Sequence, residues 1–243
     1  AHNYNNLLTV IIGNVEALRA CVHPGNLEFV DNAMAAAMDA SHLTDSLNTF
    51  SQTQTLSVRP IQLGEIMNRF TKIVTPMLGS RIVLRAATSP EDLSAEADPA
   101  QLEIALTNIV LNAMEAMPEG GELAISLTRA SVTGRRASDD SNAGLALPAD
   151  LRPGDYAVIE ISDTGVGMSE EVRLRAFEPF FTTRLPAQSE GLGLSIVHGF
   201  VKQSHGDILI QSQPGIGTTV SIFLPLLPDR SSSSREIPSA VAA

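Results

Sequence analysis

The chain of 243 residues contains a single cysteine, Cys21, no tryptophan and two tyrosines. One cysteine excludes a disulfide framework and a multi-cysteine zinc site, and it suits a reducing compartment such as the cytoplasm. The scarcity of Trp and Tyr argues against an aromatic platform on which bases stack. No uninterrupted apolar run approaches the ~20 residues that cross a bilayer, so we expect no membrane contact within this segment.

Basic residues are also scarce, because 16 Lys and Arg against 27 Asp and Glu give a formal net charge of −11. Phosphate backbones require a basic footprint, so we expect no nucleic-acid partner. Hydrophobic residues make up 44% of the chain, which is typical of a folded domain with a buried core. The chain begins Ala1-His2 without an initiator methionine or a signal-peptide pattern, and we interpret it as a fragment of a longer protein.

The first 56 residues predict two amphipathic helices, because apolar residues recur there with 4-3 spacing. A turn of His23-Pro24-Gly25-Asn26 separates the two helices, and the second apolar series runs from Phe29 to Phe50. A lone hairpin leaves its apolar stripe half exposed, so burial favours pairing with a second copy as a four-helix bundle. The first seam consists of Tyr4, Leu8, Ile11, Val15, Leu18 and Val22.

From Ser57 onward the pattern is mixed α/β, with a boundary at Arg59-Pro60. The patterns predict helices within 61–78, from Asp98-Pro99 to Gly120, and over 196–203, and strands over 81–87, 122–129, 156–162, 208–211 and 218–224. Residues 131–155 form a long polar connection, and the serine-rich tail from 229 is predicted to be disordered.

One polar constellation is Asp163-Thr164-Gly165-Val166-Gly167-Met168, which follows a strand of apolar β-formers. A carboxylate at a strand end can accept a hydrogen bond from an exocyclic amine such as that of adenine. The two glycines would let the backbone approach a flat base closely. Taken alone, the pattern also fits an ordinary turn.

A second constellation is Asn108, Asn112 and Glu115, whose i, i+4, i+7 spacing places them on one helix face. The three side chains also fit a helix face that is simply exposed to solvent. However, two Asn in mid-helix carry a propensity cost, and their amide oxygens can ligate Mg²⁺ beside phosphates.

The third constellation is Glu190-Gly191-Leu192-Gly193-Leu194-Ser195, directly before an apolar helix. Exposed backbone N–H groups at a helix N-terminus bind anions, and the helix dipole adds to this. It is not a Walker A loop, because no Gly-Lys-Ser/Thr follows. The upstream segment from Phe177 to Arg184 combines aromatics, hydroxyls and a cation, and it fits either a hydrophobic anchor or a nucleotide lid hinged at both ends.

In this order, the three constellations resemble the N, G1, F and G2 boxes of the histidine kinase ATP-binding domain, in the superfamily shared with gyrase and Hsp90. The resemblance covers Pro60 to Leu226. It implies an α+β fold class, in which a helical hairpin is followed by an α/β sandwich of the GHKL or Bergerat type. The implied domains are 1–56 for dimerisation and histidine phosphotransfer, 57–228 for ATP binding, and 229–243 as a disordered tail or linker.

The resemblance implies ATP and Mg²⁺ as cofactors and assigns roles residue by residue. Asp163 would bind the adenine amine, with Gly165, Gly167 and Thr218 shaping or supporting that wall. Asn112, together with Asn108, would hold Mg²⁺ on the phosphates. The remaining nucleotide-binding residues would be the lid residues Thr183 and Arg184 and the phosphate-facing turn of Gly191, Leu192, Gly193 and Leu194.

The opening His2-Asn3-Tyr4-Asn5-Asn6-Leu7-Leu8-Thr9 resembles the H box of hybrid-type sensor histidine kinases, which usually reads His-Asp-Phe-Asn-Asn-Leu-Leu-Thr. His2 would be the phospho-acceptor, on the polar face opposite the apolar seam. Asn3 replaces the usual acid that takes the imidazole proton, and an amide cannot accept a proton at neutral pH, so we predict slowed autophosphorylation. Asn6 matches the position that orients water for dephosphorylation. Ser189-Glu190 is a second departure, since the family often has a glycine there.

The sequence thus predicts a cytoplasmic, homodimeric core of a two-component sensor histidine kinase. It would bind ATP with Mg²⁺, autophosphorylate on His2 and pass the phosphoryl group to an aspartate of a response-regulator receiver domain. One alternative is a degenerate kinase that acts as a scaffold or phosphatase, because Asn3 has weakened autophosphorylation. Another is a GHKL-type ATPase, although Asn108 stands where those ATPases commonly have Glu, and a neutral amide suits transfer better than hydrolysis.

Overall fold

The computed structural model describes residues 2–19, 22–34, 57–88, 92–132, 147–148, 151–184 and 191–228. The chain divides into two compact units. One consists of residues 57–169 and 200–243 and contains the sheet, and the other groups residues 1–56 with 170–199.

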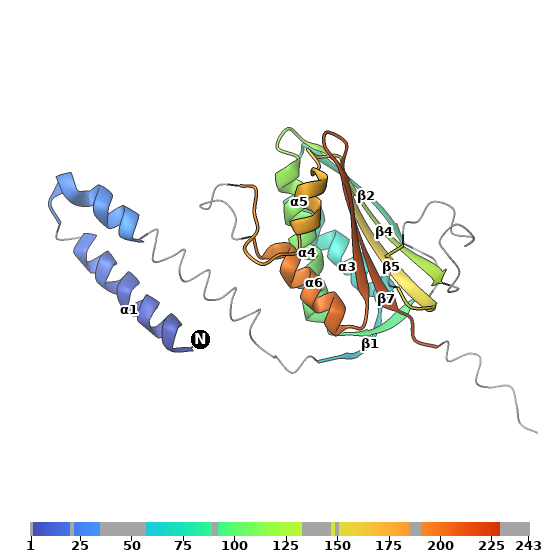
Figure 1. Ribbon diagram of the computed structural model, residues 1–243. Coiled ribbons are helices and arrows are strands. Elements are labelled where there is room, and N and C mark those ends of the chain that lie inside the picture. Colours follow the sequence, from blue (N-terminus) through green and yellow to red (C-terminus); the bar gives the residue numbers. More distant parts are fainter. Residues whose placement is uncertain are drawn as a thin grey trace, which may run out of the picture. The chain divides into compact units, whose positions relative to one another are not determined.

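The amino-terminal segment begins as the predicted helix–turn–helix. Helix α1 (His2–Arg19) is followed by the 3₁₀ turn η1 (Pro24–Asn26), and a second helix starts at residue 27 (Figure 1). Nη2 of Arg19 lies 3.3 Å from Oδ1 of Asp31, which joins the two helices by an ion pair. The rest of the predicted second helix, from residue 35 to Phe50, and the tail from 229 lie outside the described residues.

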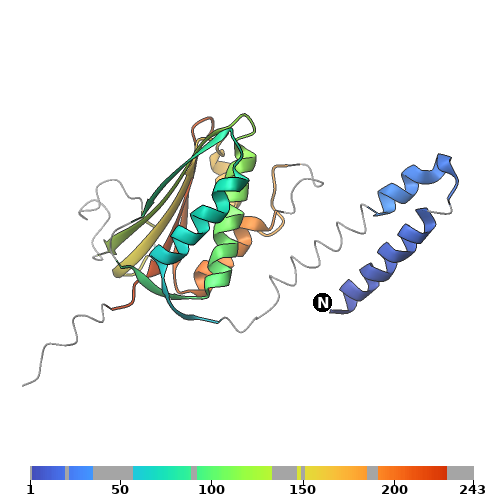
Figure 2. The ribbon, with the colours of Figure 1, turned by 180° about the vertical axis from the view of Figure 1, so that it is seen from behind.

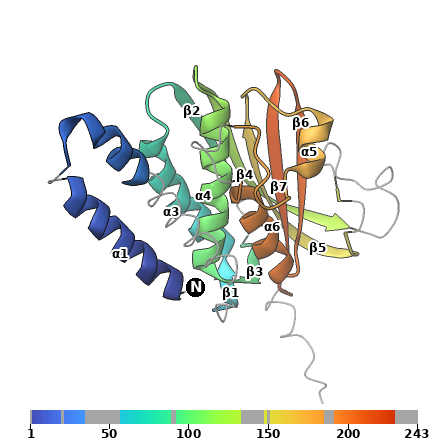
Figure 3. The same ribbon diagram turned by 60° about the vertical axis from the view of Figure 1, so that its left-hand side comes forward.

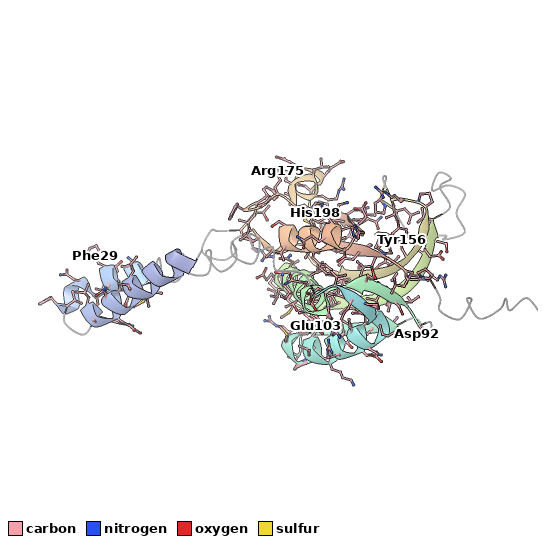
Figure 4. All side chains as sticks on the ribbon, turned by 90° about the horizontal axis from the view of Figure 1, so that it is seen from below. Phe29, Asp92, Glu103, Tyr156, Arg175 and His198 are labelled. Atoms are coloured by element: carbon pink, nitrogen blue, oxygen red, sulfur yellow. The ribbon has the colours of Figure 1, made fainter. Side chains whose placement is uncertain are left out.

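Several large apolar side chains of this segment are exposed. Ile11 is 47% exposed, Leu18 is 58% exposed and Phe29, labelled in Figure 4, is 72% exposed. Large apolar side chains with this exposure lose the free energy that burial would provide, which is the physical reason to expect a covering partner.

A five-stranded sheet forms the centre of the larger unit, in the order β2-β4-β5-β7-β6. β2 runs parallel to β4, and the other neighbours are antiparallel. Each of the five predicted strands is confirmed. Four of them extend beyond the predicted limits at both ends, and the first, predicted over 81–87, is shifted by one residue. The strands are β2 (Ile82–Thr88), β4 (Gly121–Val132), β5 (Gly154–Asp163), β6 (Asp207–Gln213) and β7 (Gly217–Pro225).

Helices α3 (Leu63–Val74) and α4 (Pro99–Ala116) lie side by side over one face of the sheet (Figures 1 and 2). Their buried side chains fill the core between helices and sheet, and Phe70, Met67, Leu102 and Leu106 are almost fully enclosed. Glu103 faces the neighbouring helix (Figure 4), and its Oε1 accepts a hydrogen bond of 2.8 Å from Nε of Arg69. The 3₁₀ turn η2 (Thr75–Met77) ends the first of these helices.

The opposite sheet face carries a smaller apolar cluster. Ala130, Tyr156, Val158 and Phe223 are buried there, and Leu147 and Leu151 pack against them. The Tyr156 hydroxyl donates to the Arg152 carbonyl at 2.9 Å. The end of the long polar connection is therefore anchored on the sheet, while its residues 133–146 lie outside the described part of the chain.

Three short elements, two strands and one helix, were not predicted from the sequence. β3 (Ser94–Ala97) pairs antiparallel with β1 (Arg59–Gln62) in a separate two-stranded sheet, and the two strands lie together in Figure 3. Its sequence Ser-Ala-Glu-Ala is poor in β-formers, so tertiary pairing and not propensity makes it a strand. Helix α5 (Glu170–Arg175) has six residues and buries none of them, so no apolar period marks it.

Asp98 connects the start of the larger unit to α4. Its Oδ1 caps that helix by accepting from the backbone N–H groups of Ala100 at 2.9 Å and Gln101 at 3.2 Å. Its Oδ2 accepts from the N–H of Ser57 at 2.9 Å. One carboxylate thus satisfies two orphan donors of the helix and holds the segment that enters this unit.

We predict that Asp98→Ala lowers the free energy of unfolding by about 1–2 kcal/mol, because the cap and the link to Ser57 are lost together. Urea denaturation followed by circular dichroism measures this. Asp92→Ala, at an exposed aspartate just upstream (Figure 4), is the control and should change stability by less than about 0.5 kcal/mol. Equal midpoints for the two variants would contradict the bridging role.

Candidate functional site

Asp163 is the last residue of β5 and is only 9% exposed. Its Oδ1 accepts the N–H of Gly165 at 2.8 Å and the N–H of Thr218 at 3.3 Å. Among the described residues, none donates a hydrogen bond to its second oxygen, Oδ2. Burial raises the pKa of this carboxyl, and the two backbone hydrogen bonds lower it in part. A largely buried carboxylate oxygen is therefore left for a donor from a ligand.

The two glycines that follow are required by close backbone contacts. A Cβ on Gly165 would lie 2.6 Å from the Ala116 carbonyl oxygen at the end of α4. Gly167 has φ +65°, and its Cβ would lie 2.0 Å from the Gln213 carbonyl oxygen. Because no side chain fits either place, the Asp-x-Gly-x-Gly pattern is more than an ordinary turn here.

The turn is held from two sides. On one side the N–H of Val166 donates to the Ala116 carbonyl at 3.0 Å, and Oγ1 of Thr164 accepts the Glu122 N–H at 3.0 Å. On the other side the hairpin of β6 and β7 meets it, since the Gly215 N–H donates to the Val166 carbonyl at 2.8 Å. The end of α4 and the hairpin, far apart in the sequence, therefore both position the segment after Asp163.

Ser212 was missed by sequence reasoning, although it contacts this turn directly. Its Oγ accepts the N–H of Met168 at 2.8 Å and lies 2.9 Å from Oγ1 of Thr218. The available signal was strand alternation: Ile210 and Ile208, two and four residues before Ser212, are buried, so Ser212 is a polar residue on the same buried face. Thr218 itself is buried, in keeping with the supporting role that the resemblance implied for it.

Asn108 and Asn112 lie on the partly exposed face of α4, away from its buried apolar residues. Nδ2 of Asn108 donates to the Ile104 carbonyl at 3.0 Å, which leaves its amide oxygen as an acceptor. Within the described residues, the Asn112 side chain has no hydrogen-bond partner. Both side chains thus present amide oxygens, the type of ligand that Mg²⁺ takes in proteins, so the residues fit the predicted ion.

The glycine turn of the other unit is also tightly built. Gly191 has φ +67°, and a Cβ there would lie 2.6 Å from the carbonyl oxygen of Phe181. The N–H of Phe180, itself at φ 67°, donates to the Gly191 carbonyl at 3.0 Å. A backbone hydrogen bond therefore joins Phe180 to Gly191, and whether the residues between them act as a nucleotide lid stays a prediction. Residues 185–190 lie outside the described part.

Helix α6 (Gly193–Gln203) begins within the glycine turn, three residues earlier than predicted. Leu192 is buried and Leu194 is partly buried. Oγ of Ser195 donates to the Leu192 carbonyl at 2.8 Å, so this hydroxyl serves the helix start. His198, labelled in Figure 4, packs on Phe177 with ring centroids 5.1 Å apart.

Of the two predicted lid residues, Thr183 is exposed and Arg184 is partly buried. Burial lowers the pKa of the Arg184 guanidinium from its ordinary value, yet arginine remains a cation at neutral pH. Arg175, labelled in Figure 4, lies over the Phe181 ring at 4.1 Å from its centroid and pairs with Glu178. The two arginines therefore lie in different environments: Arg175 contacts Phe181 and Glu178, and Arg184 is partly buried.

The remaining predicted residues, His2, Asn3 and Asn6, lie in the first turns of α1. Their side chains belong to residues 2–9, which are outside the part whose side chains are described. In the described residues, no helix is long and apolar enough to cross a membrane. The same residues contain no group of three or more His, Cys, Asp or Glu that could hold a metal ion.

Comparison with known proteins agrees with this geometry. The family described as histidine kinase-, DNA gyrase B-, and HSP90-like ATPase matches residues 97–228, a range that runs from the last residue of β3 to the end of the described chain. The chain therefore belongs to this family of ATPases. Within the family it is a histidine kinase ATPase catalytic core, because its curated relatives are sensor kinases.

Three of these relatives illustrate the similarity. The sensor kinase CckA of Brucella abortus is 34% identical over 229 residues, which are 93% of this chain and 23% of that protein. Sporulation kinase C of Bacillus subtilis is 27% identical over 94% of this chain and 48% of its own length. The sensor histidine kinase ZraS of Escherichia coli is 28% identical over 93% and 44%. The chain thus spans between about a quarter and a half of these relatives.

Solved structures show the same fold. Full-length ShkA, crystallised in complex with AMPPNP, superposes with a TM-score of 0.62 at 21% identity, over 93% of this chain and 44% of that one. The mycobacterial sensor histidine kinase MprB superposes with a TM-score of 0.52 at 26% identity, over 70% and 99%. The predicted α/β ATP-binding domain is confirmed.

We predict that Asp163→Asn abolishes most ATP binding without destabilising the nucleotide-free protein. The raised pKa means that the ionised carboxylate lowers stability at pH values above that pKa, and a neutral amide removes this cost. The Asn side chain keeps an amide oxygen that can accept from the N–H groups of Gly165 and Thr218. Its NH₂ group, however, replaces Oδ2, so two hydrogen-bond donors would face each other when the adenine amine binds. Calorimetry at pH 7 should show an ATP affinity at least about tenfold lower, and the melting temperature should not fall.

The control is Asp155→Asn, at the other end of the same strand. Hydrogen bonds from Ser131 and Arg129 lower the pKa of Asp155, so its charge adds stability that is lost only as the pH falls through that lowered value. This variant should lower the melting temperature slightly at pH 7 and leave ATP affinity unchanged. If Asp163→Asn bound ATP with wild-type affinity, the Asp163 carboxylate would not be the group that binds the adenine amine.

Proposed function

We propose that this chain is the dimerising and catalytic core of a sensor histidine kinase, which phosphorylates itself on His2 and passes the phosphoryl group to a receiver-domain aspartate. The observation that carries the proposal is the free, largely buried oxygen of Asp163, on a carboxylate whose other oxygen is held by two backbone N–H groups. A site of this kind recognises an amine, and the exocyclic amine of adenine is the one that the family match supplies.

In this proposal Asp163 accepts a hydrogen bond from the adenine amine through Oδ2. Gly165 and Gly167 leave the base room to approach the backbone. Asn112, with Asn108, would hold Mg²⁺, which would supply positive charge to offset the negative charge of the phosphates. The glycine turn from Gly191 to Leu194 offers N–H groups to phosphate oxygens, and Thr183 and Arg184 serve as lid residues beside them.

The transfer step proceeds in line at the γ-phosphorus. The bond from this phosphorus to its bridging oxygen breaks, ADP leaves with the electron pair, and a ring nitrogen of His2 forms the new P–N bond. The imidazole proton must leave as well, and because the amide of Asn3 cannot accept it, the proton passes to water. We therefore propose a slow autophosphorylation, and we propose that Asn6 orients the water for dephosphorylation, a separate hydrolytic reaction.

Asn3 favours a second candidate, in which the chain is a degenerate kinase that acts as a scaffold or phosphatase. A hydrolytic ATPase of the same superfamily is a weaker candidate, since Asn108 cannot activate water as a carboxylate does. The three candidates differ in the fate of the γ-phosphate. The kinase transfers it to His2, the degenerate kinase leaves it on ATP, and the ATPase releases it into solution.

Incubation with ATP labelled at the γ-phosphate separates them, and we predict weak labelling of the wild-type chain. Asn3→Asp should increase the labelling rate by about 10²-fold or more, because it restores the proton acceptor. His2→Ala should remove the label. The label should be acid-labile and base-stable, as a phosphoramidate is.

His42→Ala is the matched control, at a histidine that sequence analysis leaves without a role, and it should label like the wild type. Absence of label even in Asn3→Asp would favour the scaffold. Steady phosphate release without protein label would favour the ATPase. Transfer from the labelled chain to an isolated receiver domain, with loss of label from this chain, tests the proposed partner.

The homodimer proposal rests on the exposed seam residues Ile11 and Leu18 of α1. We predict that Leu18→Glu, in the seam, makes the chain monomeric, because a charge would be buried between helices. Val10→Glu is the control, since Val10 is 61% exposed, similar to the 58% of Leu18, but lies off the seam. Sedimentation equilibrium measures both, and a dimeric Leu18→Glu protein would contradict the proposed interface.

A further inference from the structure

Three polar side chains form a row across the sheet at the site. Thr218 of β7 is paired with Asp163 of β5 on one side and with Ser212 of β6 on the other. Directly paired residues of antiparallel strands project to the same face. The row two residues inward is buried and apolar, and it consists of Ile161, Val220 and Ile210. The sheet face therefore changes from apolar core to hydrogen-bonding groups at this row.

The hydrogen bonds of Ser212 determine where its proton lies. The N–H of Met168 donates to its Oγ at 2.8 Å, and the Gly217 carbonyl oxygen lies 3.0 Å from the same Oγ. A carbonyl oxygen only accepts, so the single Ser212 proton is donated to Gly217. The third contact, at 2.9 Å to Oγ1 of Thr218, must then be donated by the Thr218 hydroxyl. This arrangement satisfies every group of the network.

The consequence is that Thr218 has no proton left for a ligand. Its Oγ1 keeps lone pairs only, and it belongs to the residue directly opposite Asp163, whose Oδ2 is also an acceptor. Both polar groups of these two residues therefore accept hydrogen bonds and donate none. A base with an amine at this place is favoured, and a base with a carbonyl oxygen there meets acceptors alone.

We propose that Ser212 is a positioning residue for base selection: by holding the Thr218 proton, it keeps the site an acceptor, which selects a 6-aminopurine over a 6-oxopurine nucleotide. This rests on the proposed function, in which Asp163 binds the amine of adenine. Ser212 acts through Thr218 and does not touch the base. Without the Ser212 hydroxyl, Thr218 would be free to turn its proton toward a 6-oxo group.

The test compares ATP with inosine triphosphate, in which an oxo group replaces the 6-amino group. The dissociation constants of both are measured by calorimetry for the wild type, Ser212→Ala and Ser212→Thr. We expect the ratio of the inosine to the adenine constant to fall about fivefold in Ser212→Ala, the effect of one hydrogen bond. Ser212→Thr keeps a hydroxyl on a strand and should retain the wild-type ratio.

A purely structural role for Ser212 would weaken both nucleotides alike, and an unchanged ratio in Ser212→Ala would overturn the inference. If that variant does not fold, Thr218→Val supplies the answer, because it removes the hydroxyl at nearly constant volume. The ratio should fall there too, and an unchanged ratio would show that this hydroxyl does not select the base.

The outcome for the proposed function is read separately. A wild-type chain that binds neither nucleotide would overturn the ATP site itself. The role of Ser212 can also fail alone. In that case Asp163→Asn loses ATP binding, but Ser212→Ala keeps the wild-type ratio of the two dissociation constants. This result would leave the kinase proposal intact.

Discussion

The carboxylate of Asp163 is the constraint on which the rest of the site depends. Burying a charge at the end of β5 disfavours ionisation, and burial accordingly raises the pKa of Asp163. Two backbone N–H groups offset part of that cost at one oxygen. The other oxygen is completed only by a donor that arrives from outside. A residue that lowers the stability of the ligand-free protein in this way is typical of a binding site, because hydrogen bonds to the ligand offset the free-energy cost of burying the carboxylate.

The backbone around that carboxylate has to come very close to its neighbours, and this explains the glycines. At Gly167 and Gly217 an added Cβ would lie 2.0 Å from a carbonyl oxygen, and both residues have positive φ. The same close approach lets the end of α4, the turn after Asp163 and the β6–β7 hairpin exchange backbone hydrogen bonds. The close approach of these segments therefore holds the turn after Asp163 in place.

The periodicity of apolar residues in the long helices and strands made most of the fold predictable. The amphipathic pattern of α4 with its Asp98-Pro99 start, and the alternation in β4 and β5, depend on local propensity and on one buried face, which a sequence displays. β1, β3 and α5 were missed because none of them has such a pattern: the two strands form through their pairing with each other, and the helix buries no residue.

The sequence by itself determined the element order, the family resemblance and the candidacy of Asp163, Asn112 and the glycines, since these follow from residue type and spacing. Only the tertiary structure decided that Ser212 and Thr218 complete the row that begins at Asp163, and that Asp98 holds Ser57. Hydrogen bonds between residues about 40 to 55 positions apart depend on strand register and on the approach of separate segments. Neither is a property of any local stretch of the chain, so no local pattern could reveal them.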